Sequence, residues 1–154
     1  MTQLLLDEGY QFGLGAFETI AVEDGCPIFL EWHLERLREA MKFMGFWHEI
    51  SEEQVRQHAG KTGQTVLKII ASKENLVFLT RQNHYTKEQY DRGFKMDFSL
   101  VRRNETSPLT YYKTLNYGDC ILEKRNAVKN GIDEQIFINT KGEICEGTTT
   151  NIFF

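Results

Sequence analysis

A change in hydrophobic period early in the chain constrains its fold most strongly. Residues 16–22 (AFETIAV) are rich in β-forming side chains and stop at the turn pair 24–25 (DG), and a second apolar run covers 27–30. This pattern predicts a β-hairpin. Between 34 and 44 the apolar residues instead recur every three or four positions, which predicts an amphipathic helix that ends at Gly45. Strand and helix periods side by side indicate an α+β fold.

The following segment continues this mixed pattern. Helix-capping signatures at 51–54 (SEEQ) and 86–89 (TKEQ) predict two short helices, which we expect to end near Gly63 and Gly93. Further strands are expected at residues 65–71, 76–80 and 94–101. We therefore predict a small N-terminal α+β domain over residues 1–103, complete or nearly so, followed by a polar, proline-containing linker at 104–108.

Residues 109–154 have too few elements for a domain of their own. A helix is expected from just after Asn116 to about Asn130, and strands at 135–139, 143–146 and 151–154. One helix and three short strands cannot close a hydrophobic core. We therefore expect this region to be the incomplete start of a C-terminal domain, and the chain to stop within it.

Charge and composition exclude several classes of protein. With 18 Lys and Arg against 22 Asp and Glu, the chain carries a formal net charge of −4 and has no basic stripe, which argues against a nucleic-acid partner. The first residues lack the basic region of a signal peptide, and no apolar run reaches membrane-spanning length, so no membrane partner is expected. Three scattered cysteines, Cys26, Cys120 and Cys145, favour a reducing cytoplasm over a disulfide framework.

Three side chains have environments that suit chemistry. Lys113 follows two tyrosines, and a lysine beside aromatic rings loses hydration, which favours the neutral, nucleophilic amine. Glu146 lies between a strand and a Gly-Thr-Thr-Thr loop, as at a ligand rim, and the guanidinium of Arg36 suits a phosphate. Local sequence alone leaves commoner roles open: a solvated lysine, a turn carboxylate and a helix-surface ion pair.

Other motifs do not support alternative chemistries. Gly13 and Gly15 could suggest a dinucleotide loop, but the third glycine is replaced by Glu18 and a strand follows. We expect these glycines to permit a bulge or a close backbone approach at the strand start. The four histidines show no metal-ligand spacing, so no metal is expected, and no serine-hydrolase motif is present.

Three segments in this order resemble the class IV (fold type IV) pyridoxal-phosphate enzymes. They are residues 12–19 (FGLGAFET) with 33–37 (HLERL), then 112–117 (YKTLNY), and finally 133–153, which contains DEQIFIN, the pair EG and TNIF. This family includes branched-chain and D-amino-acid aminotransferases and 4-amino-4-deoxychorismate lyase. The resemblance implies a two-domain fold like that of D-amino-acid aminotransferase, with the C-terminal domain partial here because the family continues beyond this point.

The resemblance also implies a role for each of five residues. Lys113 would form the Schiff base with pyridoxal 5'-phosphate, and Glu146 would pair with the pyridine nitrogen of the cofactor. Arg36 would bind the cofactor phosphate. Tyr117 would approach its phenolic oxygen, and Thr150 with its neighbours would line the rim of the cofactor site.

Among the members of the family, the short Lys-Thr-Leu-Asn spacing that starts at Lys113 and the compact early segment resemble the lyase and the D-amino-acid enzymes more than the branched-chain ones, and of these we expect the lyase. We therefore expect pyruvate elimination from 4-amino-4-deoxychorismate to give p-aminobenzoate, a step of folate biosynthesis. Branched-chain or D-amino-acid transamination is the alternative, with a small amino substrate in either case. A third hypothesis is a truncated, non-catalytic assembly module. An exposed, half-built second domain would favour a homodimer.

Overall fold

The computed structural model describes residues 3–154, which fold as two compact units. The first unit takes in the chain up to His84 together with Tyr112–Leu115. The second unit consists of Tyr85–Tyr111 and Asn116–Phe154. The chain therefore leaves the second unit at Tyr111, adds four residues to the first, and returns at Asn116.

The first unit is built on an antiparallel sheet with the order β2-β1-β3-β4. Its strands are β1 (Gly15–Glu23), β2 (Cys26–Pro27), β3 (Gln64–Ser72) and β4 (Leu76–Gln82). Asp24 and Gly25 both have positive φ, 46° and 84°, as a tight hairpin turn requires. The predicted hairpin is thus confirmed, although β2 is shorter than expected because Leu30 already belongs to the next helix.

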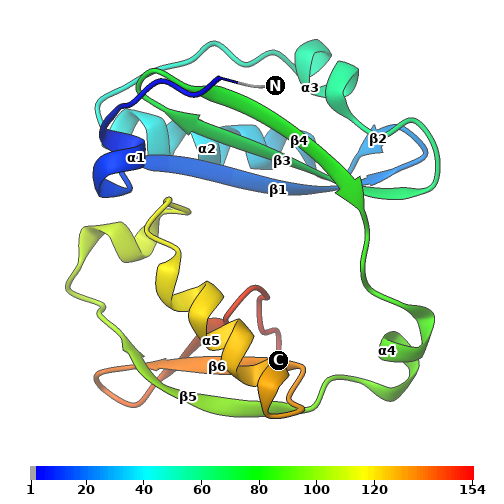
Figure 1. Ribbon diagram of the computed structural model, residues 1–154, viewed down its shortest axis with the longest axis vertical. Coiled ribbons are helices and arrows are strands. Elements are labelled where there is room, and N and C mark those ends of the chain that lie inside the picture. Colours follow the sequence, from blue (N-terminus) through cyan, green and yellow to red (C-terminus); the bar gives the residue numbers. More distant parts are fainter. Residues whose placement is uncertain (1–2) are drawn as a thin grey trace. The chain divides into compact units, whose positions relative to one another are not determined.

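Three helices accompany this sheet, and one of them covers a face of it (Figure 1). They are α1 (Glu8–Phe12), α2 (Leu30–Phe43) and α3 (Glu52–His58). The predicted apolar stripe of α2 is confirmed: Leu34, Leu37 and Met41 are each at most 1% exposed and pack with Ile20 and Leu67 of the sheet. Helix α3 ends at His58 instead of near Gly63, because the backbone at Ala59 turns extended.

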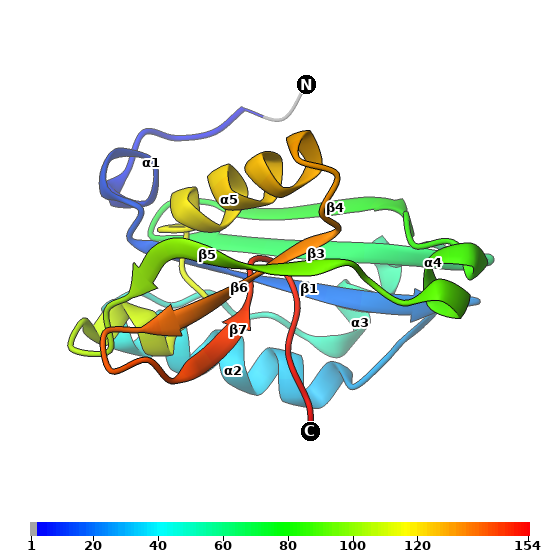
Figure 2. The same cartoon turned by 90° about the horizontal axis from the view of Figure 1, so that it is seen from below.

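The second unit contains a three-stranded sheet with the order β5-β6-β7 (Figure 2). Its elements are α4 (Lys87–Arg92), β5 (Met96–Arg103), the 3-10 helix η1 (Pro108–Tyr111), α5 (Gly118–Lys129), β6 (Glu134–Asn139) and β7 (Ile144–Gly147). β5 and β6 run parallel, and α5 packs against β6, where Phe137 is fully buried together with Cys120 and Ala127. The strand predicted at 151–154 is wrong: these residues are irregular, because Gly147 N–H donates to Thr150 C=O and closes a loop instead.

The observed grouping differs from the predicted division at 104–108. β5 lies before that point in sequence, yet its strand partner is β6, so it belongs to the second sheet. Helix α4 is held to the same unit by Arg92, whose Nη1 and Nη2 each lie 2.7 Å from a carboxylate oxygen of Asp133. Within residues 3–154, no helix is both long and apolar enough to cross a membrane.

A buried carboxylate fastens the N-terminal segment to the first sheet. Asp7 is 6% exposed and accepts hydrogen bonds from Ser72 Oγ at 2.6 Å, from Glu74 N at 2.9 Å and from Asn75 Nδ2 at 2.9 Å. Burial alone would raise the pKa of Asp7, but these donors outweigh it and lower the pKa from 3.8 to about 2. The carboxylate thus stabilises the fold above its unfolded pKa, and this contribution disappears as the pH falls towards 2.

Asp7→Asn should therefore destabilise the protein in a pH-dependent way. At pH 7 we expect a loss of about 1–2 kcal/mol in the free energy of unfolding, which shrinks as the pH falls from about 4 to 2. Denaturant unfolding at a series of pH values measures this difference. Glu8→Gln, at an exposed position of α1, is the control. An equal deficit for Asp7→Asn at pH 7 and pH 2 would contradict the assignment.

Candidate functional site

Lys113 is placed by backbone pairing with the edge of β1. Phe17 N–H donates to the carbonyl of Lys113 at 3.0 Å, and Leu115 N–H donates to the carbonyl of Gly15 at 2.8 Å. Between them Ala16 and Thr114 form an antiparallel bridge. β2 pairs only with the far end of β1, at Val22 and Glu23, so residues 112–115 add a short strand where this edge would otherwise be open.

This pairing depends on a glycine. A Cβ at Gly15 would lie 2.6 Å from Leu115 Cδ1 and 2.7 Å from the carbonyl oxygen of Ala71, closer than packed atoms tolerate. Only a residue without a side chain lets β1 approach both neighbours. The predicted close backbone approach is confirmed at this position.

Aromatic rings surround the segment on which Lys113 lies. Lys113 Nζ is 4.7 Å from the centroid of the Phe17 ring, within the range of a cation–π contact. The preceding residue, Tyr112, stacks on Phe43 of α2 with ring centroids 4.2 Å apart. The aromatic environment inferred from the two tyrosines is therefore present, but Phe17 supplies the ring that Lys113 contacts.

Arg36 is anchored by a buried carboxylate of β1. Its Nε and Nη2 lie 2.5 and 2.7 Å from the two oxygens of Glu18, whose side chain is 1% exposed. His33 Nδ1 lies 2.7 Å from the same carboxylate, which can only accept, so this nitrogen carries the proton. His33 and Arg36, one turn apart on α2, therefore both contact Glu18, whose side chain points from β1 towards this helix.

This arrangement fixes the charge state of both partners. Burial would raise the pKa of Glu18, but the hydrogen bonds from His33 and Arg36 and their charges lower it. The hydrogen bonds that Arg36 donates to Glu18 raise the pKa of Arg36. The Arg36 side chain is still 51% exposed, and its Nη1 makes no hydrogen bond within residues 3–154. The Nη1 edge of the Arg36 guanidinium can therefore bind an anion.

In the second unit, Glu146 of β7 is held by Arg103 of β5, which belongs to the same sheet. Arg103 Nη2 lies 2.6 Å from Glu146 Oε1 and 3.0 Å from the sulfur of Cys120, and its guanidinium stacks over Phe137 at 4.5 Å. Arg103 is only 18% exposed, and burial alone would lower its pKa, but Cys120 and Glu146 raise it. The second oxygen of Glu146 accepts no hydrogen bond within the described chain, and the side chain is 38% exposed.

Tyr117 and Thr150 lie in the same unit and contact the loop after β7. The Tyr117 hydroxyl donates to the carbonyl of Thr148 at 2.9 Å, and burial raises the pKa of this phenol, which therefore stays protonated. Thr150 Oγ1 donates at 3.2 Å to Glu134, so its side chain faces into the unit.

Glu134 organises that loop. Its carboxylate is fully buried and accepts hydrogen bonds from the hydroxyls of Thr148, Thr149 and Thr150, while Lys124 Nζ lies 3.3 Å away. Burial would raise the pKa of Glu134, but these donors and the charge of Lys124 lower it. A Cβ at Gly147 would collide with Thr150 Oγ1, so this glycine allows the loop to close on the carboxylate.

The structure thus places the five predicted residues in two groups. Arg36 and Lys113 belong to the first unit, and Tyr117, Glu146 and Thr150 belong to the second. Sequence reasoning missed the buried carboxylates Glu18 and Glu134 and the arginine Arg103. Glu18 had a usable signal, because strand alternation places it on the same face as Ile20 and Val22. Arg103 had none, since it lies beside the segment interpreted as a linker.

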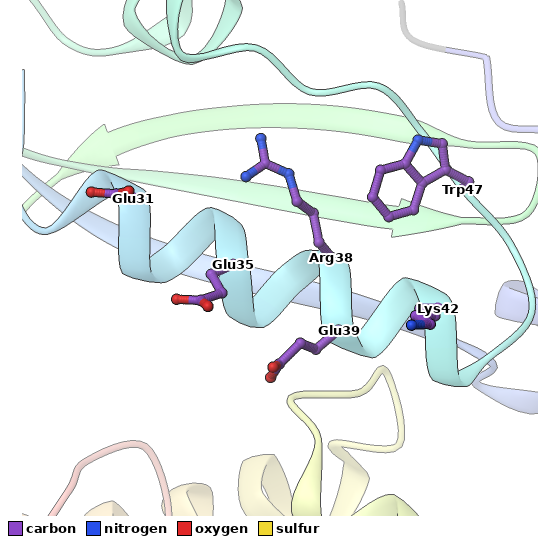
Figure 3. A pocket seen from close by; sticks show the side chains of 6 residues that line it. All are labelled: Glu31, Glu35, Arg38, Glu39, Lys42 and Trp47. Carbon is purple, nitrogen blue, oxygen red and sulfur yellow. The ribbon is translucent and has the colours of Figure 1, made fainter.

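A surface cavity of about 390 Å³ lies on the outer side of α2, and none of the five predicted residues lines it (Figure 3). It is lined by Glu31, Glu35, Arg38, Glu39, Lys42 and Trp47. Its lining mixes three acidic side chains with two basic ones. Within residues 3–154, no group of three His, Cys, Asp or Glu side chains could hold a metal ion.

Comparison with known proteins identifies the relatives of this chain. The model of the amino-transferase class IV family matches residues 15–154. The aminodeoxychorismate lyase of Bacillus subtilis (strain 168) is 26% identical, over 96% of this chain and 57% of that protein. A bifunctional aminodeoxychorismate lyase / D-amino acid transaminase of Mycobacterium tuberculosis is 24% identical, over 91% of this chain and 56% of that protein.

Solved structures share the fold. A hypothetical aminotransferase from Mycobacterium tuberculosis, solved in its PLP-bound form, superposes with a TM-score of 0.74. It is 22% identical and is matched over 96% of this chain and 60% of that one. The predicted α+β fold of the class IV enzymes is therefore confirmed. The chain spans a little more than half the length of these relatives.

Glu134→Gln should destabilise the second unit. A glutamine amide would point an N–H group at threonine hydroxyls and Lys124, which act here as donors, and would leave Lys124 without its carboxylate. We expect a loss of roughly 2–4 kcal/mol in the free energy of unfolding, measured by denaturant titration. Glu88→Gln, exposed on α4, serves as the control. Equal stability of the two variants would contradict the role of Glu134.

Proposed function

Because the chain belongs to the class IV aminotransferases, we propose that it acts in an enzyme dependent on pyridoxal 5'-phosphate, with Lys113 carrying the cofactor. The observation that supports this best is the fixed position of Lys113. Its segment pairs with β1 through two backbone hydrogen bonds, while Nζ projects to an aromatic ring. A lysine that must form and release a covalent bond repeatedly needs such a rigid backbone.

The surroundings of Arg36 fit a phosphate. Glu18 holds Nε and Nη2 of the guanidinium and leaves the Nη1 edge for an anion. This pre-orientation lowers the entropy cost of binding, and an arginine fork matches phosphate oxygens. We therefore assign the cofactor phosphate to Arg36.

Glu146 fits a protonated ring nitrogen. Arg103 binds Oε1, which leaves Oε2 to accept a hydrogen bond from a pyridinium N–H. When bound, the cofactor supplies an electron sink for carbanionic character on the substrate. Glu146 supports that chemistry by keeping a compensating negative charge at the ring nitrogen.

Tyr117 and Thr150 take supporting positions in this proposal. The Tyr117 proton is donated to Thr148 C=O, so its oxygen would accept a hydrogen bond from the phenolic group of the cofactor. Thr150 faces Glu134 with its hydroxyl and would border the cofactor through its backbone and methyl group. Lys113 Nζ, once released, takes a proton from the amino substrate and returns it, as a general base and acid.

For the reaction itself we propose 4-amino-4-deoxychorismate lyase activity, giving pyruvate and p-aminobenzoate. The named activity of the Bacillus subtilis relative supports it, and the short spacing after Lys113 favours it over branched-chain transamination. Transamination of D-amino acids is the alternative, supported by the second activity of the Mycobacterium tuberculosis relative. The cytoplasmic location and the homodimer stay predictions.

Incubation with pyridoxal 5'-phosphate followed by borohydride should attach the cofactor to Lys113. Peptide mass spectrometry locates the adduct. Lys113→Ala should abolish it and lower turnover by about 10²- to 10⁴-fold, since the general acid–base group is lost. The exposed Lys61→Ala should retain both. An adduct on another lysine, or none on the wild-type chain, would refute the proposal.

Product analysis then separates the two reactions. The lyase proposal predicts release of p-aminobenzoate and pyruvate from 4-amino-4-deoxychorismate. Keto-acid formation from D-alanine, without p-aminobenzoate release, would assign the chain to the transaminases instead.

A further inference from the structure

The outer side of α2 carries charged residues in one straight row. They are spaced by four, three and four positions, so on a helix of about 3.6 residues per turn they form a single narrow stripe. The buried stripe of the same helix lies on a different side. All members of the row line the cavity on the outer side of α2 (Figure 3). We call these residues the charged row: Glu31, Glu35, Arg38 and Lys42.

The acids occupy the first half of the charged row and the bases occupy the second half. Glu31 therefore lies one helical turn from another acid, Glu35. Arg38 likewise lies one turn from another base, Lys42. Like charges at this separation destabilise a helix. Within the part of the chain that the structure describes, no ion pair relieves either repulsion, and Arg38 Nη2 donates to the carbonyl oxygen of Ile50 at 3.2 Å.

The helix dipole explains only the two ends of the charged row. It favours an acid in the first turn and a base in the last turn, which accounts for Glu31 and Lys42. The effect falls off within one turn, so it does not account for Glu35 and Arg38 nearer the middle of the helix. The order of these two inner charges is therefore not explained by α2 alone.

The charged row is complementary to itself when one copy is reversed. If a second α2 lies antiparallel on the first, Glu31 stands opposite Lys42 of the second copy. In the same register Glu35 stands opposite Arg38 of the second copy, and a two-fold axis repeats both pairs. The spacing of the row is also that of residues at the contact line of two helices lying along each other. A parallel arrangement would instead bring like charges together, so the row selects the antiparallel one.

An exposed indole beside the charged row supplies apolar surface to the same contact. Trp47 is 54% exposed and lines the cavity together with the row. Its ring and the side chain of Arg38 point to the same side of α2 (Figure 3). Ion pairs on a protein surface contribute little by themselves, whereas a tryptophan covered by a partner often dominates the binding energy. A second helix lying along the row would cover this ring.

We propose that the charged row of α2 is an antiparallel contact surface between two copies of this chain, with Trp47 at its edge. The chemistry that selects the partner is the order of charge, which only a surface with bases opposite the acids can match. This inference goes beyond the proposed function, because it holds whether or not the chain binds a cofactor. The test therefore uses the full chain without pyridoxal 5'-phosphate.

The test reverses each half of the row separately. One protein carries Glu31→Lys and Glu35→Lys, and the other carries Arg38→Glu and Lys42→Glu. Each alone would place like charges across the contact, but a mixture of the two would again place opposite charges there. Sedimentation velocity and native mass spectrometry measure the association, and circular dichroism shows that the proteins are folded. The control has the same change in charge at exposed positions of the same unit, Glu8→Lys with Glu74→Lys.

We expect the wild-type chain to dimerise with a Kd of about 1–100 µM and to dissociate as salt is added. Each reversed protein should bind itself at least about 10-fold more weakly, and their mixture should form a heterodimer with an affinity close to wild type. The control should dimerise like the wild type. Trp47→Ala, which leaves the row intact, should weaken the dimer about 10-fold or more.

Several results would overturn the inference. A wild-type chain that stays monomeric at about 100 µM would do so. Reversed proteins that dimerise as well as the wild type would show that two copies meet through another surface. Equal weakening in the control would show that net charge is the cause. If a reversed protein fails to fold, Glu35→Gln replaces it, and a Kd unchanged in both Glu35→Gln and Trp47→Ala would equally contradict the proposal.

Discussion

The first unit depends on a short segment, residues 112–115, that follows the first stretch of the second unit in sequence. Residues 112–115 pair with the edge of β1 through Phe17 N–H and Leu115 N–H, and this pairing requires Gly15. Backbone hydrogen bonds fix the direction in which a side chain leaves a strand far better than a loop does. The position of Lys113 is therefore set by β1, a strand distant in sequence, and Tyr112 adds a ring contact with Phe43.

Buried carboxylates likewise fix the positions of the side chains around them. Glu18 orients Arg36, and Glu134 gathers three consecutive threonines and Lys124. A buried carboxylate is costly unless all its oxygens accept hydrogen bonds, so each one dictates where its donors must lie. At the third site the charges are exchanged: the more buried partner is the cation Arg103, and it holds the more exposed carboxylate of Glu146. Charge pairing thus holds Arg36 in the first unit and Glu146 in the second.

Local sequence patterns predicted many of the helices and strands, but they did not predict the contacts between residues distant in sequence. The stripe through Leu34 and Met41 identified α2, and the capping box at Thr86 is present with both of its hydrogen bonds. A shared role for Lys113 and Glu146 could be predicted only from the family resemblance, which rests on the order of three segments along the chain. Strand alternation indicated that Glu18 faces the core, but its pairing with Arg36 of α2, and that of Arg103 with Glu146, join residues distant in sequence and could not be predicted from spacing. Residues 151–154 have a strand-like composition, but a strand also needs a partner edge, and the loop at Gly147 closes before one is reached.

Amide hydrogen exchange at two positions tests most directly whether edge pairing with β1 positions Lys113. The amides of Phe17 and Leu115 should both be protected in the wild-type chain, and both should exchange rapidly in Gly15→Ala. The amide of Ile28, which donates to Ala21 at the β2 side of β1, should stay protected in both proteins. Rapid exchange of Phe17 and Leu115 in the wild type, or undiminished protection in Gly15→Ala, would contradict the account.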